Sequence, residues 1–274
     1  MPELPEVETI ARQLAPRLTG RRIRRATLKT ADVLRRVSKP RLLRTLTGNT
    51  ILGVERRAKH AVIRLRSGHR LVIQPRMTGN LIVYDTLSAA DARYAVLTCG
   101  LDDGRLFVYR DVRRLGTVWL LDDTAWSAYD ARLGPEPLDP GFTAAAFALR
   151  LRGTRAAIKK AIMDQRRLVG VGNIYANEAL FDAAIDPSRS AARLEPAELE
   201  RLHGAIQDVL RRAIAASGTT VRDYRTGTGA SGTFQFELQV YDRAGEPCLR
   251  CGRRLATTHA IDGRQTTFCY SCQR

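Results

Sequence analysis

The chain has 274 residues, 44 % of them hydrophobic, and a formal net charge of +17 from 45 Lys and Arg against 28 Asp and Glu. This apolar content excludes wholesale disorder, and no apolar run approaches the roughly 20 residues that would span a bilayer. The length predicts two domains, with one large domain as the alternative. The N-terminus shows no secretory signal, so we expect a cytosolic protein without a membrane partner. The positive charge is distributed along the chain, which favours a long polyanion such as nucleic acid over a small acidic substrate. A surface that is merely solvated by arginine is the alternative.

The first 18 residues combine an amphipathic helix with an unusual start. Residues 4–18 predict a helix from apolar side chains at helical spacing. Removal of Met1 would leave Pro2 with a free secondary amine, a group of pKa about 7.7–8.0 that condenses with aldehyde-level carbon. Glu3 and Glu6 would lie beside that amine on one helix face, as an acid and a base. The alternative is that acids in a first turn only complement the helix dipole.

Between residues 23 and 121 the sequence changes to short β-branched and aromatic runs separated by turn signals, which predicts an antiparallel sandwich or barrel. The clearest strands are expected at 61–65, 70–74, 81–84, 94–99, 105–110 and 117–121. Cys99 lies in one of these runs and is expected in the core.

Two turns of this region carry residues that would either pack in the protein core or insert into a DNA duplex. Met77 stands at a strand-to-turn junction, where it would plug the core or wedge into a base stack. Arg113 and Leu115, at the end of another hairpin, offer the same choice. There an arginine would fill the space left by an extruded base.

Beyond residue 133 the sequence predicts a change of domain. Three prolines in residues 134–140 predict a linker. The helical period that follows predicts a domain over 141–234 with helices at 142–151, 154–164, 173–184 and 196–217. The glycine-rich stretch at 227–232 lies within this domain, where such loops are often functional.

Glycines at 170 and 172 precede the third of these helices and would allow close approach of a phosphate to its N-terminus. Asn173 is a candidate helix N-cap that would also reach the phosphate. A plain turn with a cap explains the segment equally well.

Four cysteines in the last 27 residues follow the spacing of a tetrahedral, structural zinc site, and we expect one Zn²⁺ there. They are Cys248, Cys251, Cys269 and Cys272. A turn at Asp262-Gly263 lies between the two pairs, and Arg264 follows it. The turn would place this arginine against a DNA phosphate. The alternative is that Arg264 is only an exposed turn residue.

The motifs together resemble the formamidopyrimidine-DNA glycosylase family over essentially the whole chain. The resemblance rests on the residues at 2–8, 56–59, 77–79, 111–114, 133–138, 169–176 and 238–241 and on the four cysteines. It implies an α+β protein with an N-terminal antiparallel β-sandwich and N-terminal helix (1–133), a helix–two-turn–helix domain (141–234) and a β-hairpin zinc finger (235–274). It also implies a monomeric glycosylase and AP lyase that binds damaged double-stranded DNA across a cleft.

The resemblance implies a role for each matching residue. Pro2 would be the Schiff-base nucleophile, Glu3 the general acid/base and Glu6 a supporting residue. Lys59 would bind the phosphate next to the lesion and donate a proton during elimination. Arg264 would act in the last elimination.

The same match implies how DNA is held. Asn173 and Arg264 would clamp the phosphates that flank the extruded nucleotide. Independently of the match, the distributed positive charge predicts Lys159 as a further DNA contact. Met77, Arg113 and Leu115 would fill the void in the duplex, and the loop at 227–232 would close over an oxidised purine.

Two departures from the family pattern bear on the substrate. Residues 74–76 are Gln-Pro-Arg where the family usually has His-Leu-Gly, and Leu115 replaces the usual Phe. We expect removal of oxidised purines such as 8-oxoguanine and formamidopyrimidines. The alternatives are an endonuclease VIII-like preference for oxidised pyrimidines and a zinc-finger paralogue that binds lesions without cutting.

Overall fold

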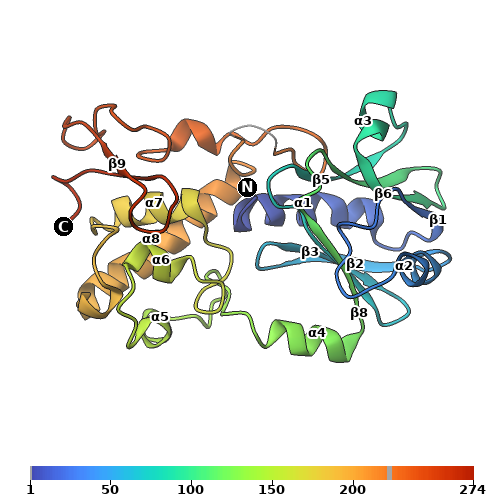
Figure 1. The fold of residues 1–274 in the computed structure, drawn as a ribbon, viewed down its shortest axis with the longest axis horizontal. Coiled ribbons are helices and arrows are strands. Elements are labelled where there is room, and N and C mark those ends of the chain that lie inside the picture. The colour runs from blue at the N-terminus through green and yellow to red at the C-terminus, as the bar shows by residue number, and fades with distance from the viewer. Residues whose placement is uncertain (1, 221–223) are drawn as a thin grey trace. The chain divides into compact units, whose positions relative to one another are not determined.

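The computed structural model describes residues 2–220 and 224–274, which form two compact units (Figure 1). Unit 1 comprises Met1–Ala131 and Ala216–Thr233, and unit 2 comprises Arg132–Ala215 and Phe234–Arg274. Among the described residues, no helix is both long and apolar enough to cross a membrane.

Unit 1 is an antiparallel β-sandwich, as the sequence predicts. Its two four-stranded sheets have the orders β1-β6-β7-β5 and β2-β3-β4-β8. The strands are β1 (Ile23–Leu28), β2 (Ile51–Arg57), β3 (His60–Leu65), β4 (Arg70–Gln74), β5 (Gly79–Tyr84), β6 (Ala95–Leu101), β7 (Leu106–Asp111) and β8 (Thr117–Leu121). Inward-facing side chains of all eight strands share one buried core with the first helix, so the sheets pack face to face.

Helix α1 (Leu4–Leu18) has the predicted bounds. Its fully buried side chains recur at three- and four-residue intervals, and α1 packs on β2, β3 and β5. These side chains are Leu4, Val7, Ile10, Leu14 and Leu18. Burial of this stripe fixes the N-terminal end of the chain against the sandwich.

Three further helices of unit 1 were not predicted. They are α2 (Lys39–Leu46), α3 (Ala89–Arg93) and α4 (Asp123–Asp130). Each is short and begins at a side chain that accepts a backbone N–H of its first turn, from Ser38, Ser88 and Asp122. Capping and packing stabilise such helices although their hydrophobic period is too short to detect.

Unit 2 contains the predicted helical domain and the β-hairpin. Its elements are α5 (Ala144–Leu151), α6 (Ile158–Ile162), α7 (Asn173–Asp182), the 3₁₀ turn η1 (Ala191–Arg193), α8 (Pro196–Ala215), the 3₁₀ turn η2 (Phe234–Glu237), β9 (Ala256–Thr258) and β10 (Thr266–Phe268). Helix α8 packs against α5 and α7 (Figure 1).

Helix α6 is much shorter than the predicted 154–164. Ala157 forms an isolated antiparallel bridge with Ser190, and the Ile158 N–H donates to the Arg189 carbonyl at 2.7 Å. The residues before Ile158 are therefore extended, because their hydrogen bonds go to a distant segment instead of along a helix.

The domain boundaries differ from the predicted ones. The proline-rich segment 134–140 packs within unit 2, where the Gly134 N–H donates to the Gln165 carbonyl at 2.8 Å and the Pro137 carbonyl accepts from Gln207 at 2.9 Å. Residues 216–233 group with the sandwich and not with the helical domain. Proline stops helices and strands, but it does not prevent a segment from packing.

Candidate active site and nucleic-acid interface

The start of α1 holds the two predicted catalytic carboxylates in a buried capping arrangement. Glu3 is the N-cap of α1, with an extended backbone, and Glu6 is the third residue of the helix. The Glu3 N–H donates to Glu6 Oε2 at 2.8 Å, and both residues are at most 3 % exposed. Glu3 therefore precedes the helix, and the two acids do not share one helix face as predicted. Pro2, directly before Glu3, is buried as well.

Glu6 also connects α1 to a segment more than 200 residues later. Its Oε1 accepts the Thr219 N–H at 2.7 Å, and a Cβ on Gly218 would lie 2.9 Å from the same oxygen. Tyr224 donates to the Ser217 carbonyl at 3.1 Å. Burial and the nearby Glu6 charge raise the pKa of Tyr224, which keeps the phenol neutral. Both oxygens of Glu6 are thus used to hold backbone, which fits the supporting role predicted for it.

Lys59 lies in the tight turn between β2 and β3 and is 6 % exposed. Two neighbouring arginines fix this hairpin: Arg56 Nε donates to Glu8 Oε2 of α1 at 2.8 Å, and Arg57 Nε donates to Asp130 Oδ1 of α4 at 2.5 Å. Burial raises the pKa of Glu8, but the hydrogen bonds and charges of Arg56 and Arg12 outweigh it and leave that pKa lowered. The turn is therefore held from both sides.

His60, the residue after Lys59, was not singled out from the sequence. It is 5 % exposed, with Nδ1 at 3.2 Å from the Arg57 carbonyl and Nε2 at 3.0 Å from the Tyr129 hydroxyl. Burial lowers the pKa of His60 to about 4. A neutral ring with a proton on Nδ1 satisfies both contacts. His60 therefore connects the turn that carries Lys59 to Tyr129 of α4.

The predicted void-filling residues are exposed at two turns of the sandwich. Met77 is 45 % exposed and Leu115 is 42 % exposed, and Arg113 lies in the same exposed turn as Leu115. These values exclude the alternative that they plug the core. Arg76 has a φ of +50°, the conformation that favours glycine, and the family pattern has glycine at this position.

The glycine-rich stretch packs on the sandwich. Gly227 lies so close to α1 that a Cβ would be 3.1 Å from the Ile10 carbonyl, and the Thr228 N–H donates to Gln13 Oε1 at 3.1 Å. The Arg225 N–H donates to Asn80 Oδ1 at 2.9 Å. This part of the segment is therefore anchored to α1 and β5.

In unit 2, Asn173 and Arg264 are brought together. The N-cap of α7 is Gly172 and not Asn173, which is the first helical residue. The Asn173 side chain instead donates from Nδ2 to the Gln265 carbonyl at 3.0 Å. Arg264 is exposed, and its N–H donates to Asp262 Oδ1 at 3.1 Å. Asn173 thus holds the backbone next to Arg264.

Lys159 does not lie where a DNA contact requires. Its side chain is completely buried, with Nζ donating to Thr266 Oγ1 at 2.7 Å and lying 3.6 Å from Asp262 Oδ1. Thr266 Oγ1 in turn lies 3.4 Å from the Arg264 carbonyl, to which it donates. The ammonium group therefore supports the turn that carries Arg264, and the prediction from its charge is corrected because burial places that charge inside the fold.

Arg264 borders a basic hollow on unit 2 of about 490 Å³. Lys160, Arg166 and Arg167 line it as well, together with Asp164 and Asp262. Cations outnumber acids here, so the hollow suits an anionic group.

The four cysteines converge as a metal site requires. Their sulfur atoms all lie within 4.8 Å of one another, with 3.9 Å between Cys248 and Cys272 and 3.5 Å between Cys251 and Cys269. Sulfurs around a tetrahedral zinc ion at Zn–S of about 2.3 Å lie about 3.8 Å apart. The cluster fits a four-coordinate ion, with no position left open for water.

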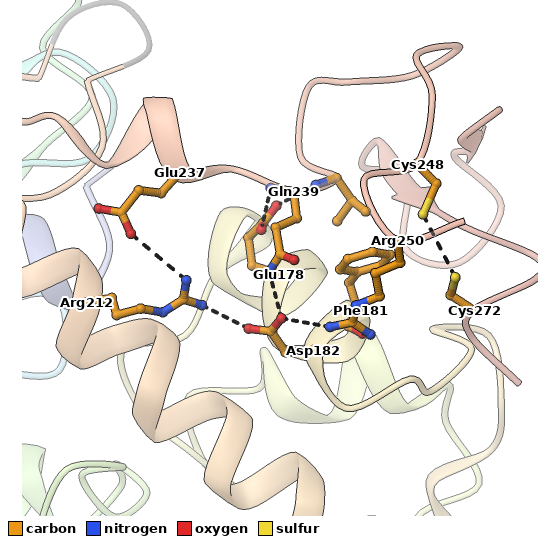
Figure 2. Close-up of polar contacts among 10 residues, drawn as sticks. Glu178, Phe181, Asp182, Arg212, Glu237, Gln239, Cys248, Arg250 and Cys272 are labelled. Atoms are coloured by element: carbon orange, nitrogen blue, oxygen red, sulfur yellow. Dashed lines mark hydrogen bonds and ion pairs between the residues drawn. The ribbon is translucent and has the colours of Figure 1, made fainter. Parts of the chain in front are cut away.

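The cysteine hairpin is docked on α7 by a polar network that was not predicted (Figure 2). Glu178 is 1 % exposed and accepts the backbone N–H groups of residues 239–241 at 2.8–3.0 Å. Arg250, between Cys248 and Cys251, donates to the Phe181 carbonyl at 2.7 Å and to Asp182 Oδ1 at 3.1 Å. The first cysteine pair is therefore tied directly to the C-terminal turn of α7.

Two family profiles match the chain. Residues 1–118 match the profile described as "Formamidopyrimidine-DNA glycosylase N-terminal domain", and residues 133–225 match "Formamidopyrimidine-DNA glycosylase H2TH domain". The two profiles cover most of the sandwich and most of the helical domain.

Curated relatives and solved structures match over the full length. The formamidopyrimidine-DNA glycosylase of Chloroflexus aurantiacus is 42 % identical over 100 % of this chain and 98 % of its own, and that of Symbiobacterium thermophilum is 45 % identical over 100 % and 89 %. Among solved structures, a Lactococcus lactis FPG mutant in complex with DNA containing Fapy-dG superimposes with a TM-score of 0.92 at 34 % identity, covering 100 % of both chains. The Lactococcus lactis Fpg in complex with DNA containing an abasic site gives a TM-score of 0.91 at 34 % identity, covering 99 % of both.

Proposed function

The chain belongs to the formamidopyrimidine-DNA glycosylase family, and we propose on this basis that it excises oxidised purines from duplex DNA and then cuts the strand as an AP lyase. The enzyme is a DNA glycosylase of base-excision repair. The observation that carries the finer proposal is the buried start of α1, where Pro2 is buried and the Glu3 N–H donates to Glu6.

The first step is attack by the Pro2 amine on C1′ of the extruded nucleotide. The amine must be unblocked, because a secondary amine can form an iminium only when its single N–H can be lost. The new N–C1′ bond forms as the bond from C1′ to the base breaks, and the base leaves with a proton. The C1′–O4′ bond of the sugar then breaks, O4′ takes a proton and the amine loses its N–H proton, which gives the iminium between Pro2 and C1′. We assign the proton transfers of this step to Glu3, whose carboxyl group lies next to Pro2 in sequence and is buried.

Two eliminations then cut the strand. The iminium withdraws electrons and acidifies the C2′–H, so loss of that proton expels the 3′ phosphate, and a second elimination expels the 5′ phosphate. Lys59, in a turn fixed by Arg56 and Arg57, would hold the phosphate next to the lesion and supply a proton. Arg264, which is exposed on a turn of unit 2, would act in the later elimination.

The remaining residues would hold DNA. We propose that Asn173 and Arg264 bind flanking phosphates and that Met77, Arg113 and Leu115 occupy the space that the extruded base leaves. The four cysteines would hold one Zn²⁺, whose contribution when bound is to fold the hairpin that presents Arg264.

Borohydride trapping tests this chemistry. Lesion-containing duplex and the enzyme should give a covalent adduct, because borohydride reduces the iminium to a stable amine. A variant with one residue inserted before Pro2 should form no adduct and make no incision, while its duplex affinity stays within a fewfold of wild type. Trapping that persists in the blocked variant would remove Pro2 from this role, and binding without any incision would favour the non-cleaving paralogue.

A second substrate class has its own support. One structure similar to this chain, with a TM-score of 0.90 at 34 % identity, is a complex between the Lactococcus lactis Fpg and an oxidised pyrimidine-containing DNA. Competing duplexes that carry 8-oxoguanine or thymine glycol decide between the classes. We expect the purine lesion to be cut faster, and a preference for thymine glycol would establish endonuclease VIII-like specificity.

A further inference from the structure

The two turns that carry the proposed void-filling residues lie side by side at one end of the sandwich. Strand β4 pairs with β8 so that Gln74 faces Thr117, and β5 pairs with β7 so that Gly79 faces Asp111. The turn at 75–78 therefore leaves one sheet and enters the other, and the turn at 112–116 makes the reverse crossing next to it. The strand registers alone bring Met77 and Arg113 to the same end of unit 1.

The carboxylate of Asp111, which is 2 % exposed, lies between the two turns. Its Oδ1 accepts the hydroxyl of Thr78 from the first turn. Its Oδ2 accepts the Gly116 N–H of the second turn at 2.8 Å and the Tyr109 hydroxyl at 2.9 Å. Burial and the Asp111 charge raise the pKa of Tyr109, so the phenol remains a donor.

Thr78 also connects the turn at 75–78 directly to the backbone of the turn at 112–116. Its Oγ1 accepts the Arg113 N–H at 3.1 Å, so its own proton is directed to Asp111. Three donors therefore converge on the two oxygens of one carboxylate, while an amide in the same place would offer only one acceptor oxygen.

Both turns are also packed so closely at a glycine that they have no room for a side chain at that position. A Cβ on Gly116 would lie 2.0 Å from the Tyr109 hydroxyl oxygen and 2.7 Å from the Gln74 carbonyl oxygen. A Cβ on Gly79 would lie 2.3 Å from the Pro75 carbonyl oxygen. The hydrogen bonds to Asp111 and the close packing at the two glycines thus restrain the same two turns.

We propose that Asp111 is a positioning residue that joins the two turns into one rigid unit, so that Met77 enters the base stack together with Arg113 and Leu115. The inference rests on the proposed function of these three side chains. Side chains that separate stacked bases must be held in a fixed position. If the turn that carries them could move, the turn would shift and the bases would stay stacked. Asp111 supplies that stiffness without contacting DNA.

The test compares D111N and T78V with T78S, which keeps the hydroxyl, and with D91N as a matched control. Asp91 is another carboxylate of unit 1 and pairs with Arg110 of β7 at 2.6 Å. Loss of the bridge should lower kcat/KM on an 8-oxoguanine duplex by about tenfold, the effect of one lost buried hydrogen bond to a charged group. Cleavage of a single-stranded oligonucleotide with an abasic site, which needs no base extrusion, should stay within twofold, and T78S and D91N should match wild type on both substrates.

Two further measurements separate the possible failures. In wild type, M77A and L115A should be strongly non-additive in base extrusion followed by 2-aminopurine fluorescence, and in D111N they should be additive. Hydrogen exchange without DNA should show that D111N raises exchange at 76–78 and 113–116 together. Equal losses on both substrates, unchanged exchange, or coupling that persists in D111N would overturn the positioning role. If M77A and L115A leave extrusion intact in wild type, the void-filling function fails, whatever the exchange result.

Discussion

At the scale of single residues, three buried ionisable side chains support the proposed site through partners far away in the sequence. Glu6 holds Thr219, His60 holds Tyr129 and Lys159 holds Thr266. Each of them stabilises the backbone beside a proposed functional residue. Buried ionisable side chains in this protein, whether charged or neutral, therefore position other groups.

The pair of adjacent lysines at 159 and 160 gives a matched test of this role. K159M removes the buried partner of Asp262 and Thr266 and should lower the free energy of unfolding of unit 2 by about 3 kcal/mol. K160M changes an exposed lysine and should shift the free energy of unfolding by less than about 0.5 kcal/mol. Chemical denaturation at fixed pH checks both values, and equal stability of the two variants would contradict the structural role of Lys159.

His60 makes stability depend on pH with a defined sign. Its pKa is about 4 in the folded protein against 6.5 for an ordinary histidine, so between these values the unfolded chain binds the proton and the folded chain does not. The contribution of neutral His60 is complete above pH 6.5 and is lost as the pH falls towards 4, by about 3 kcal/mol in total.

The variant H60F removes this titration. The difference in unfolding free energy between wild type and H60F should therefore shrink by that amount between pH 7 and pH 4, measured by urea denaturation at each pH. Two curves that stay parallel over this range would show that His60 does not titrate as its burial implies.

At the scale of elements, the cysteine hairpin depends on its metal and on α7. Residues 244–274 contain two three-residue strands, β9 and β10, and their small core is shared with Phe181 of α7. So short a segment cannot offset its ordering entropy by burial alone, so metal binding should supply much of its folding free energy. The network of Glu178 and Arg250 then determines where the folded hairpin sits (Figure 2).

Removal of the metal should therefore act locally. A chelator should abolish hydrogen-exchange protection in 244–274 and weaken duplex binding, while protection of β3 and β4 persists because their core lies in unit 1. C251S should reproduce this loss without chelator, and C99S, which alters a buried cysteine outside the cluster, should keep one zinc per chain. Full protection of 244–274 in metal-free protein would refute the folding role.

At the scale of the whole molecule, the charge of +17 determines how binding responds to salt. Each phosphate that a cation neutralises releases counterions, so duplex affinity should fall steeply and linearly on a log–log plot against salt. R264A should weaken binding equally for unrelated sequences and reduce this slope by about one. An unchanged slope in fluorescence-anisotropy titrations would show that Arg264 makes no phosphate contact.

Local sequence patterns determined much of this protein. The bounds of α1, the β-rich first half, the helical second half and the four-cysteine site follow from hydrophobic period and spacing, which depend on near neighbours. The motifs at the N-terminus and around Arg264 likewise identified candidate site residues without any knowledge of packing.

Only the tertiary structure decided which side chains are buried and what they hold. It places Lys159 inside unit 2, assigns both oxygens of Glu6 to backbone groups, and brings Thr78 and Gly116 to the carboxylate of Asp111. The contacts of Lys159 with Asp262, of Glu6 with Thr219 and of Asp111 with Thr78 join residues that are distant in sequence, and their strength comes from burial and geometry. A sequence pattern records the type of each side chain but not its distance from a partner, so these roles could not be predicted from it.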